Sequence, residues 1–141
     1  MSILKTTSKT NFLAVTASAV LALAANGALA QSAEPFQLGA IVSITGGGAA
    51  IGVVAPMGWQ LAVDQVNATG GILGRQVVFT IADSATDPTH AVSEARRLVE
   101  NVGIEAMVGP VTSQETIPVT AVTTEFNIAQ ITTAASPALT P

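Results

Sequence analysis

A break between a short strand and a helix places two hydroxyl residues side by side in this 141-residue chain. The apolar residues 106–108 can finish a buried strand, and Gly109–Pro110 ends it. Thr112 and Ser113 then stand at the start of a helix, where either can act as the cap. The N-terminus of a helix offers free backbone N–H groups that attract a carboxylate or a phosphate. The stretch therefore predicts either an ordinary helix cap or a binding site for a small anion.

Strand and helix patterns alternate on both sides of this stretch. Apolar and β-branched runs predict four strands, at 36–44, 77–82, 104–108 and 128–133. Apolar residues at helical spacing predict three helices, over about 52–68, 87–101 and 113–126. Asp87 followed by Pro88 is a helix-start signal, and Pro56 is tolerated if it lies in a first turn. This alternation is typical of an α/β fold in which helices cover both faces of a parallel sheet.

The carboxyl ends of parallel strands share one edge of the sheet, and ligands bind beyond that edge. The loops expected there are those that follow the four strands, at 45–51, 83–88, 109–113 and 133–136. Thr112, Ser113 and Ser136 would then form a polar, uncharged cluster. Hydroxyls and helix N–H groups bind a small carboxylate without doing chemistry on it.

Composition narrows the classes of function. The chain has nine acidic and five basic residues, a formal net charge of −4, no cysteine and one histidine. An acidic chain is not drawn to nucleic acid or anionic lipid. Without cysteine there is no disulfide and no thiolate metal site. The single His90 offers no metal cluster or catalytic triad, and we expect it to be solvated on its helix. We expect no cofactor and no nucleic-acid partner.

Two alternatives with a different chemistry remain open. Gly46–Gly48 resembles a phosphate-binding turn, and Asp83 ends a strand as a ribose-binding acid would. However, Ile51 stands where the dinucleotide fingerprint needs glycine, and no lysine follows residue 9 to complete a Walker A loop. An aspartate at a strand end is more often turn chemistry. A hydrolase would use Ser113 or Ser136 as its nucleophile, but Ser113 lacks the G-x-S-x-G context and His90 lies on another predicted helix.

The first thirty residues have the pattern of a secretory signal peptide. Lys5 and Lys9 precede an apolar segment at 12–25, and Ala28–Ala30 supplies a small-x-small cleavage site. An uncleaved membrane anchor is the alternative, but the apolar run is short for a span of roughly 20 residues. We therefore expect export, with cleavage after residue 30 and a mature part over 31–141.

A series of motifs resembles the branched-chain amino-acid-binding proteins of ABC importers, which are type I periplasmic solute-binding proteins. The most specific parts are Asn67–Arg75 (NATGGILGR), the Asp87–Pro88 helix start, and Gly109–Pro110 followed by Ser113. The resemblance covers 37–141. It implies a periplasmic location for the exported protein. It also implies a two-lobe α/β fold that closes on a ligand, with 31–141 as the N-terminal part of the first lobe and the second lobe absent.

The same resemblance implies a function. Such a protein captures an amino acid or a related small amide or carboxylate, delivers it to the permease of an ABC transporter, and is not an enzyme. A ligand-sensing receptor lobe of the same fold is the alternative, and a nucleotide-binding α/β domain is a more distant one. Because the second lobe would supply the acid that pairs with the ammonium, we expect the chain alone to bind poorly.

Residue roles also follow from the resemblance. Ser113 would hold the ligand α-carboxylate at the helix N-terminus, with Thr112 beside it. The backbone of Ala134, together with the backbone and hydroxyl of Ser136, would hold the carboxylate and the ammonium. The binding segment also includes Ala135. Outside these segments, Ile51 stands where some members carry an aromatic residue that walls the side-chain pocket.

Overall fold

The computed structural model describes residues 34–139, so the expected signal peptide and its cleavage site lie outside the described residues. A single parallel sheet with strand order β2-β1-β3-β4 forms the centre of the fold. Its strands are β1 (Phe36–Val42), β2 (Val77–Asp83), β3 (Ala106–Val108) and β4 (Ala129–Ile131). β1 and β2 pair along their whole length, from Phe36 opposite Val77 to Val42 opposite Asp83. The predicted parallel sheet is confirmed, with β1, β3 and β4 shorter than expected and β2 one residue longer.

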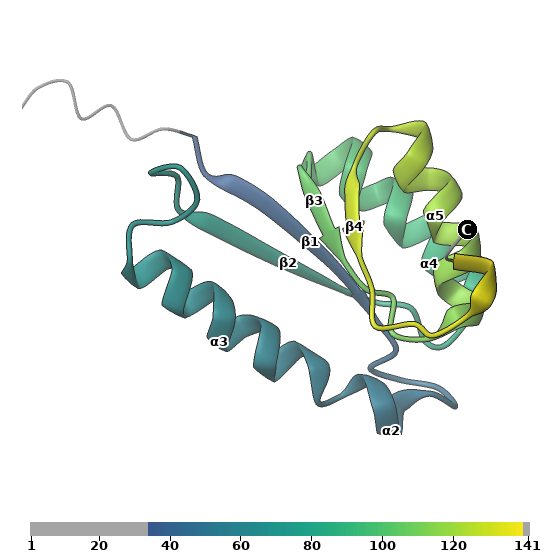
Figure 1. Ribbon diagram of the computed structural model, residues 1–141. Coiled ribbons are helices and arrows are strands. Elements are labelled where there is room, and N and C mark those ends of the chain that lie inside the picture. The colour runs from purple at the N-terminus through teal and green to yellow at the C-terminus, as the bar shows by residue number, and fades with distance from the viewer. Residues whose placement is uncertain (1–33, 140–141) are drawn as a thin grey trace, which may run out of the picture. The chain divides into compact units, whose positions relative to one another are not determined.

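Helices cover both faces of this sheet, as predicted. They are α2 (Ala49–Gly52), α3 (Ala55–Ala68), α4 (Pro88–Arg97) and α5 (Ser113–Glu125). A π-helical segment, η1 (Leu98–Val102), prolongs α4, and a short 3₁₀ turn, η2 (Pro137–Leu139), follows β4. Figure 1 shows α3 on one side of the sheet and α4 with α5 on the other. Across residues 34–139, none of the helices has both the length and the apolar character needed to cross a bilayer.

The single helix predicted over 52–68 is wrong at its start, because the structure has two helices there. Pro56 lies in the first turn of α3 and has no N–H to donate to the carbonyl four residues earlier. The chain therefore breaks between α2 and α3. Gly52 at the end of α2 lies tightly against the residue that follows β1, since a Cβ there would come within 2.0 Å of the Ser43 carbonyl oxygen.

The main core lies between the sheet and the pair α4–α5. Ile41, Ala82 and Met107 contribute from the strands and are almost fully buried. They meet the buried residues of the two helices and η1, namely Ala91, Ala95, Leu98, Val119 and Val122. The apolar stripe predicted for the helix that starts at Asp87 is thus confirmed as the inner face of α4.

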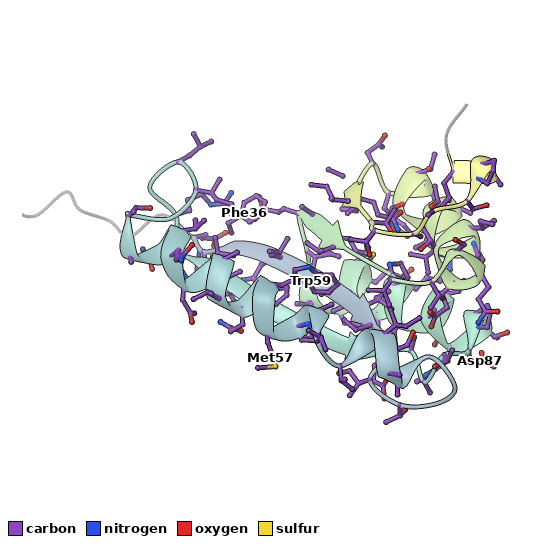
Figure 2. All side chains as sticks on the ribbon, turned by 60° about the horizontal axis from the view of Figure 1, so that its bottom comes forward. Phe36, Met57, Trp59 and Asp87 are labelled. Atoms are coloured by element: carbon purple, nitrogen blue, oxygen red, sulfur yellow. The ribbon has the colours of Figure 1, made fainter. Side chains whose placement is uncertain are left out.

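The other face of the sheet is covered by α3. Its predicted inner stripe, Trp59 to Val66, lines a hollow of about 170 Å³ together with Leu38, Val77 and Val108. Figure 2 shows Trp59 and Met57 leaving α3 on opposite sides, and Met57 is 73% exposed. The fold therefore sets all strand ends at one edge, with a helix starting beyond three of them.

Candidate ligand-binding site

The loops that follow β1 and β2 are joined by hydrogen bonds at the carboxyl edge of the sheet. The Thr45 hydroxyl donates to Asp83 Oδ2 at 2.6 Å. The Thr86 hydroxyl donates to the Thr45 carbonyl at 2.8 Å and accepts from the Gly48 N–H at 2.9 Å. These hydrogen bonds join the two loops into one wall of the edge.

The loops that follow β3 and β4 are joined in the same way. The Thr132 hydroxyl donates to the Pro110 carbonyl at 2.6 Å and accepts from the Ala134 N–H at 3.0 Å. The Gln130 side chain donates to the Gly109 carbonyl at 2.9 Å. The sequence interpretation did not single out either side chain. Together they hold the two segments that the family resemblance assigned to ligand binding.

The structure brings these two segments to neighbouring strand ends. Ser113 is the first residue of α5 and is partly exposed, and its hydroxyl makes no hydrogen bond within residues 34–139. The Ser136 oxygen accepts from the Ala138 N–H at 3.3 Å, which leaves its hydroxyl hydrogen for another acceptor. The Ala134 N–H is engaged with Thr132, so this residue can offer a ligand its carbonyl. Ala135 is exposed between them.

The two remaining residues predicted for the site, Ile51 and Thr112, differ in what they can offer a ligand. Ile51 lies on α2 after the β1 loop and is 66% exposed at the same edge. The Thr112 hydroxyl donates to the carboxylate of Glu115, so its hydrogen is not free for a ligand carboxylate. Thr112 can still offer its backbone N–H.

A buried carboxylate, that of Glu115, lies under this edge, and the sequence interpretation did not single it out. Glu115 is 0% exposed, and its Oε2 accepts from the Ser43 hydroxyl at 2.8 Å as well as from Thr112. The Ser84 hydroxyl lies 3.4 Å from Ser43. The spacing of Thr112 and Glu115, three residues apart, is that of a capping box and could have drawn attention to the pair.

The first turn of α5 can hold an anion. The Thr116 N–H bonds to the Thr112 carbonyl at 3.0 Å, so the N–H groups that precede it have no carbonyl partner in the helix. The N-cap side chain does not bond to them. A carboxylate placed there would meet these donors, the positive end of the helix dipole and the Ser113 hydroxyl.

The glycine-rich turn does not form an open phosphate cradle. Gly46 has φ +81°, and a Cβ there would come within 2.2 Å of the Ala85 carbonyl oxygen. Asp83 accepts hydrogen bonds from four donors, at Ile44, Thr45 and Ala85. Partial burial opposes ionisation of Asp83, but these hydrogen bonds outweigh it and lower the pKa of the carboxyl below its ordinary value. Asp83 therefore stabilises the turns at the ends of β1 and β2, and this favours the turn interpretation over that of a ribose-binding acid.

The described residues also contain no set of three or more acidic, histidine or cysteine side chains that could hold a metal ion. The His90 side chain is 50% exposed on α4, 4.0 Å from Glu94. This confirms the expectation that His90 is solvated.

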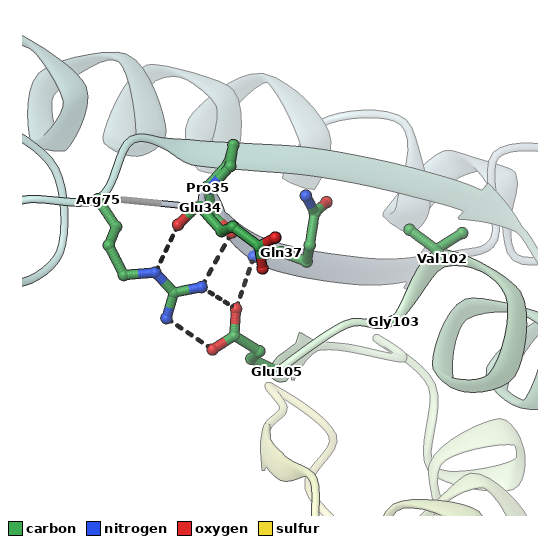
Figure 3. A pocket seen from close by; sticks show the side chains of 7 residues that line it. All are labelled: Glu34, Pro35, Gln37, Arg75, Val102, Gly103 and Glu105. Atoms are coloured by element: carbon green, nitrogen blue, oxygen red, sulfur yellow. Dashed lines mark hydrogen bonds and ion pairs between the residues drawn. The ribbon is translucent and has the colours of Figure 1, made fainter. Parts of the chain in front are cut away.

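A second hollow, of about 560 Å³, lies at the opposite edge, where the strands begin. Figure 3 shows the Arg75 guanidinium between Glu34, Pro35 and Glu105, where it donates to the carbonyls of Glu34 and Pro35 and to both oxygens of Glu105. The hydrogen bond from Arg75 lowers the pKa of Glu105. These hydrogen bonds fix the segment that leads into β1. Because the Arg75 donors are already used in this way, the hollow offers little to a ligand.

Comparison with known proteins places this arrangement in a family. The family described as periplasmic binding protein matches residues 35–141. The Leu/Ile/Val-binding protein BraC3 of Rhizobium johnstonii is 45% identical over 73% of this chain and 28% of its own length. A leucine-, isoleucine-, valine-, threonine- and alanine-binding protein of Pseudomonas aeruginosa is 32% identical over 84% of this chain and 31% of its own.

Solved structures show the same fold. The branched-chain amino acid transporter substrate-binding protein LivJ of Streptococcus pneumoniae, in complex with isoleucine, superposes with a TM-score of 0.71 and 33% identity. That match covers 73% of this chain and 30% of LivJ. The chain thus spans less than a third of the length of these relatives. The chain belongs to the periplasmic binding protein family, and its parallel sheet with flanking helices has the type I fold of its structural neighbours.

Proposed function

We propose that this chain carries the head-group site of an extracytoplasmic solute-binding protein that captures an amino acid and delivers it to the permease of an ABC importer. The observation that carries the proposal is the uncapped start of α5, which follows β3, while the segment 134–136 follows the neighbouring strand β4. The relatives support it, because their names give leucine, isoleucine and valine as ligands. A related small amide or carboxylate remains within the proposal.

Each end of an amino-acid head group has a matching group at this edge. The α-carboxylate would accept from the first N–H groups of α5 and from the Ser113 hydroxyl. The ammonium would donate to the Ala134 carbonyl and the Ser136 oxygen. Ile51, exposed on α2, would contact the ligand side chain. No base is hydrogen-bonded to the Ser113 or Ser136 hydroxyl among the described residues, so the cluster suits binding and not nucleophilic attack.

Localisation and partners belong to the same proposal. A signal peptide over residues 1–30 would send the chain to the periplasm, and a permease in the inner membrane would receive the ligand. The named relatives are binding proteins, which supports a role without turnover. A ligand-sensing receptor lobe of this fold is the second candidate, and it would use the same head-group contacts without a permease.

A chimera tests the proposal. Residues 34–139 replace the matching segment of the Rhizobium johnstonii relative, and calorimetry follows titration with leucine, isoleucine and valine. We expect saturable binding, with much weaker binding of leucinamide because it lacks the carboxylate. The unmodified relative is the positive control, and a thermal melt verifies that the chimera is folded. A folded chimera that binds none of these ligands, or that binds leucinamide as well as leucine, would contradict the proposal.

A further inference from the structure

Two helices of this fold begin in different ways. Asp87 caps α4, and its carboxylate accepts from the His90 N–H at 2.7 Å. Thr112 holds the same N-cap position before α5, with an extended backbone at φ −102° and ψ 144°. From this backbone a threonine hydroxyl can accept from an N–H of the first turn. The Thr112 hydroxyl makes no such bond and donates to Glu115 instead.

The contact between Thr112 and Glu115 is not a capping box. In a capping box the N-cap hydroxyl accepts from the N3 backbone N–H, and the N3 carboxylate accepts from the N-cap backbone N–H. Here the two side chains bond to each other, and Glu115 Oε2 also accepts from the Ser43 hydroxyl at 2.8 Å. Ser43 is 0% exposed at the end of β1. The carboxylate is therefore also held from the segment that follows β1, which opposes any movement that would release Thr112.

Stability alone does not account for this carboxylate. Glu115 is 0% exposed, and its Oε1 is fully enclosed without a hydrogen-bond partner among residues 34–139. Enclosing an ionisable group with an unpaired oxygen destabilises a fold, and the positive end of α5 offsets only part of that effect. Local rules of this kind are broken mainly at functional sites.

We propose that Glu115 is a positioning residue of the ligand site. By accepting the Thr112 hydroxyl, it keeps that hydroxyl off the first turn of α5. The N–H groups of that turn then stay open to the carboxylate of an amino acid. This inference rests on the proposed function, because it names what prepares the same site for its ligand.

The expected effect follows from the strength of a helix cap. Without the carboxylate, the Thr112 hydroxyl can rotate and cap the first turn, and a ligand must then displace it. A threonine cap contributes about 1 kcal/mol, which corresponds to about fivefold in an equilibrium constant. Removing the acceptor should therefore protect the N–H groups from exchange and weaken carboxylate binding, each by about fivefold.

Amide exchange in the full chain tests the capping step without any ligand. Glu115→Met removes the acceptor and keeps the side-chain volume, and it should slow exchange of the N–H groups at Gln114 and position 115 about fivefold. Adding Thr112→Val should restore fast exchange, and Glu115→Gln, which keeps an acceptor oxygen, should match the unmodified chain. If Glu115→Met does not fold, the exchange rates of the Thr112→Val single variant test the proposal. It should leave these rates unchanged, whereas faster exchange would show that the hydroxyl was already a cap and would overturn the proposal.

A leucine titration of the same variants, placed in the chimera with the Rhizobium johnstonii relative, tests the consequence for binding. Glu115→Met should raise the dissociation constant for leucine about fivefold, and Thr112→Val in that background should lower it again. A purely packing role for Glu115 would give no recovery in the double variant and would overturn the proposal. If exchange behaves as expected but the folded chimera does not bind leucine, the positioning role of Glu115 is supported and the amino-acid function is overturned. Unchanged exchange rates in Glu115→Met overturn the device whatever leucine does.

Discussion

Replacing Thr132 by valine should loosen the two segments proposed to bind the head group. Its hydroxyl donates to the Pro110 carbonyl at 2.6 Å and accepts from the Ala134 N–H at 3.0 Å. Valine has nearly the same shape and can make neither bond. Each net hydrogen bond contributes about 0.5–1.5 kcal/mol. Because the Pro110 carbonyl keeps the Thr116 hydroxyl at 3.1 Å, we expect a loss of about 1–2 kcal/mol in the free energy of unfolding.

Urea denaturation measures this loss directly. With a slope of about 1 kcal/mol/M, the midpoint should fall by roughly 1–2 M while the slope stays the same. Thr133→Val is the matched control, because Thr133 is exposed and its hydroxyl makes no hydrogen bond within residues 34–139. It should leave the midpoint within the error of the measurement. Equal midpoints for the two variants would refute the argument that Thr132 ties the β3 and β4 loops together.

Two further predictions concern the loops that follow β1 and β2. The pKa of Asp83 is lowered in the folded state, so its contribution to stability is present above about 3.8, the ordinary value, and is lost as the pH falls through the lower folded value. Asp83→Asn should thus lower stability by about 1 kcal/mol at neutral pH, and this difference should shrink toward pH 2 in acid titrations; a pH-independent difference would count against it. Gly46→Ala should lower stability by more than about 1 kcal/mol, because φ is +81° and the new Cβ meets the Ala85 carbonyl. Gly47→Ala, with nothing within 4 Å, is its control in the same melts, and an equal loss in both would contradict the argument.

The fold was predictable because its signals are local. The Asp87–Pro88 start and the apolar stripe of α4 are read within one helix, and both are confirmed. Strand ends were less predictable, since they depend on contacts between loops. β1 stops at Val42, and the Ile44 N–H then bonds to the carboxylate of Asp83 from the neighbouring strand. Such a contact leaves no trace in the pattern of one segment.

In the candidate site, too, local features were predictable and features that depend on distant contacts were not. The position of Ser113 at a helix start follows from the strand-break-helix pattern, and the structure places it there. The diversion of the Thr112 hydroxyl could not be predicted, because the Glu115 carboxylate is fixed by Ser43, 72 positions away in the sequence. The roles of Gln130 and Thr132 likewise depend on the packing of β4 beside β3. The ligand roles of Ser113 and Ser136 remain predictions.

The central claim is that Ser113 and Ser136 hold the head group of an amino acid, and leucine affinity in the chimera tests it most directly. Ser113→Ala and Ser136→Ala should each raise the dissociation constant by roughly 5- to 150-fold, the equivalent of about 1–3 kcal/mol for a hydrogen bond to a charged group. Ser93→Ala is the matched control, because Ser93 is exposed on α4 and should leave affinity unchanged. Unchanged affinity in both Ser113→Ala and Ser136→Ala would contradict the account and place the head group elsewhere.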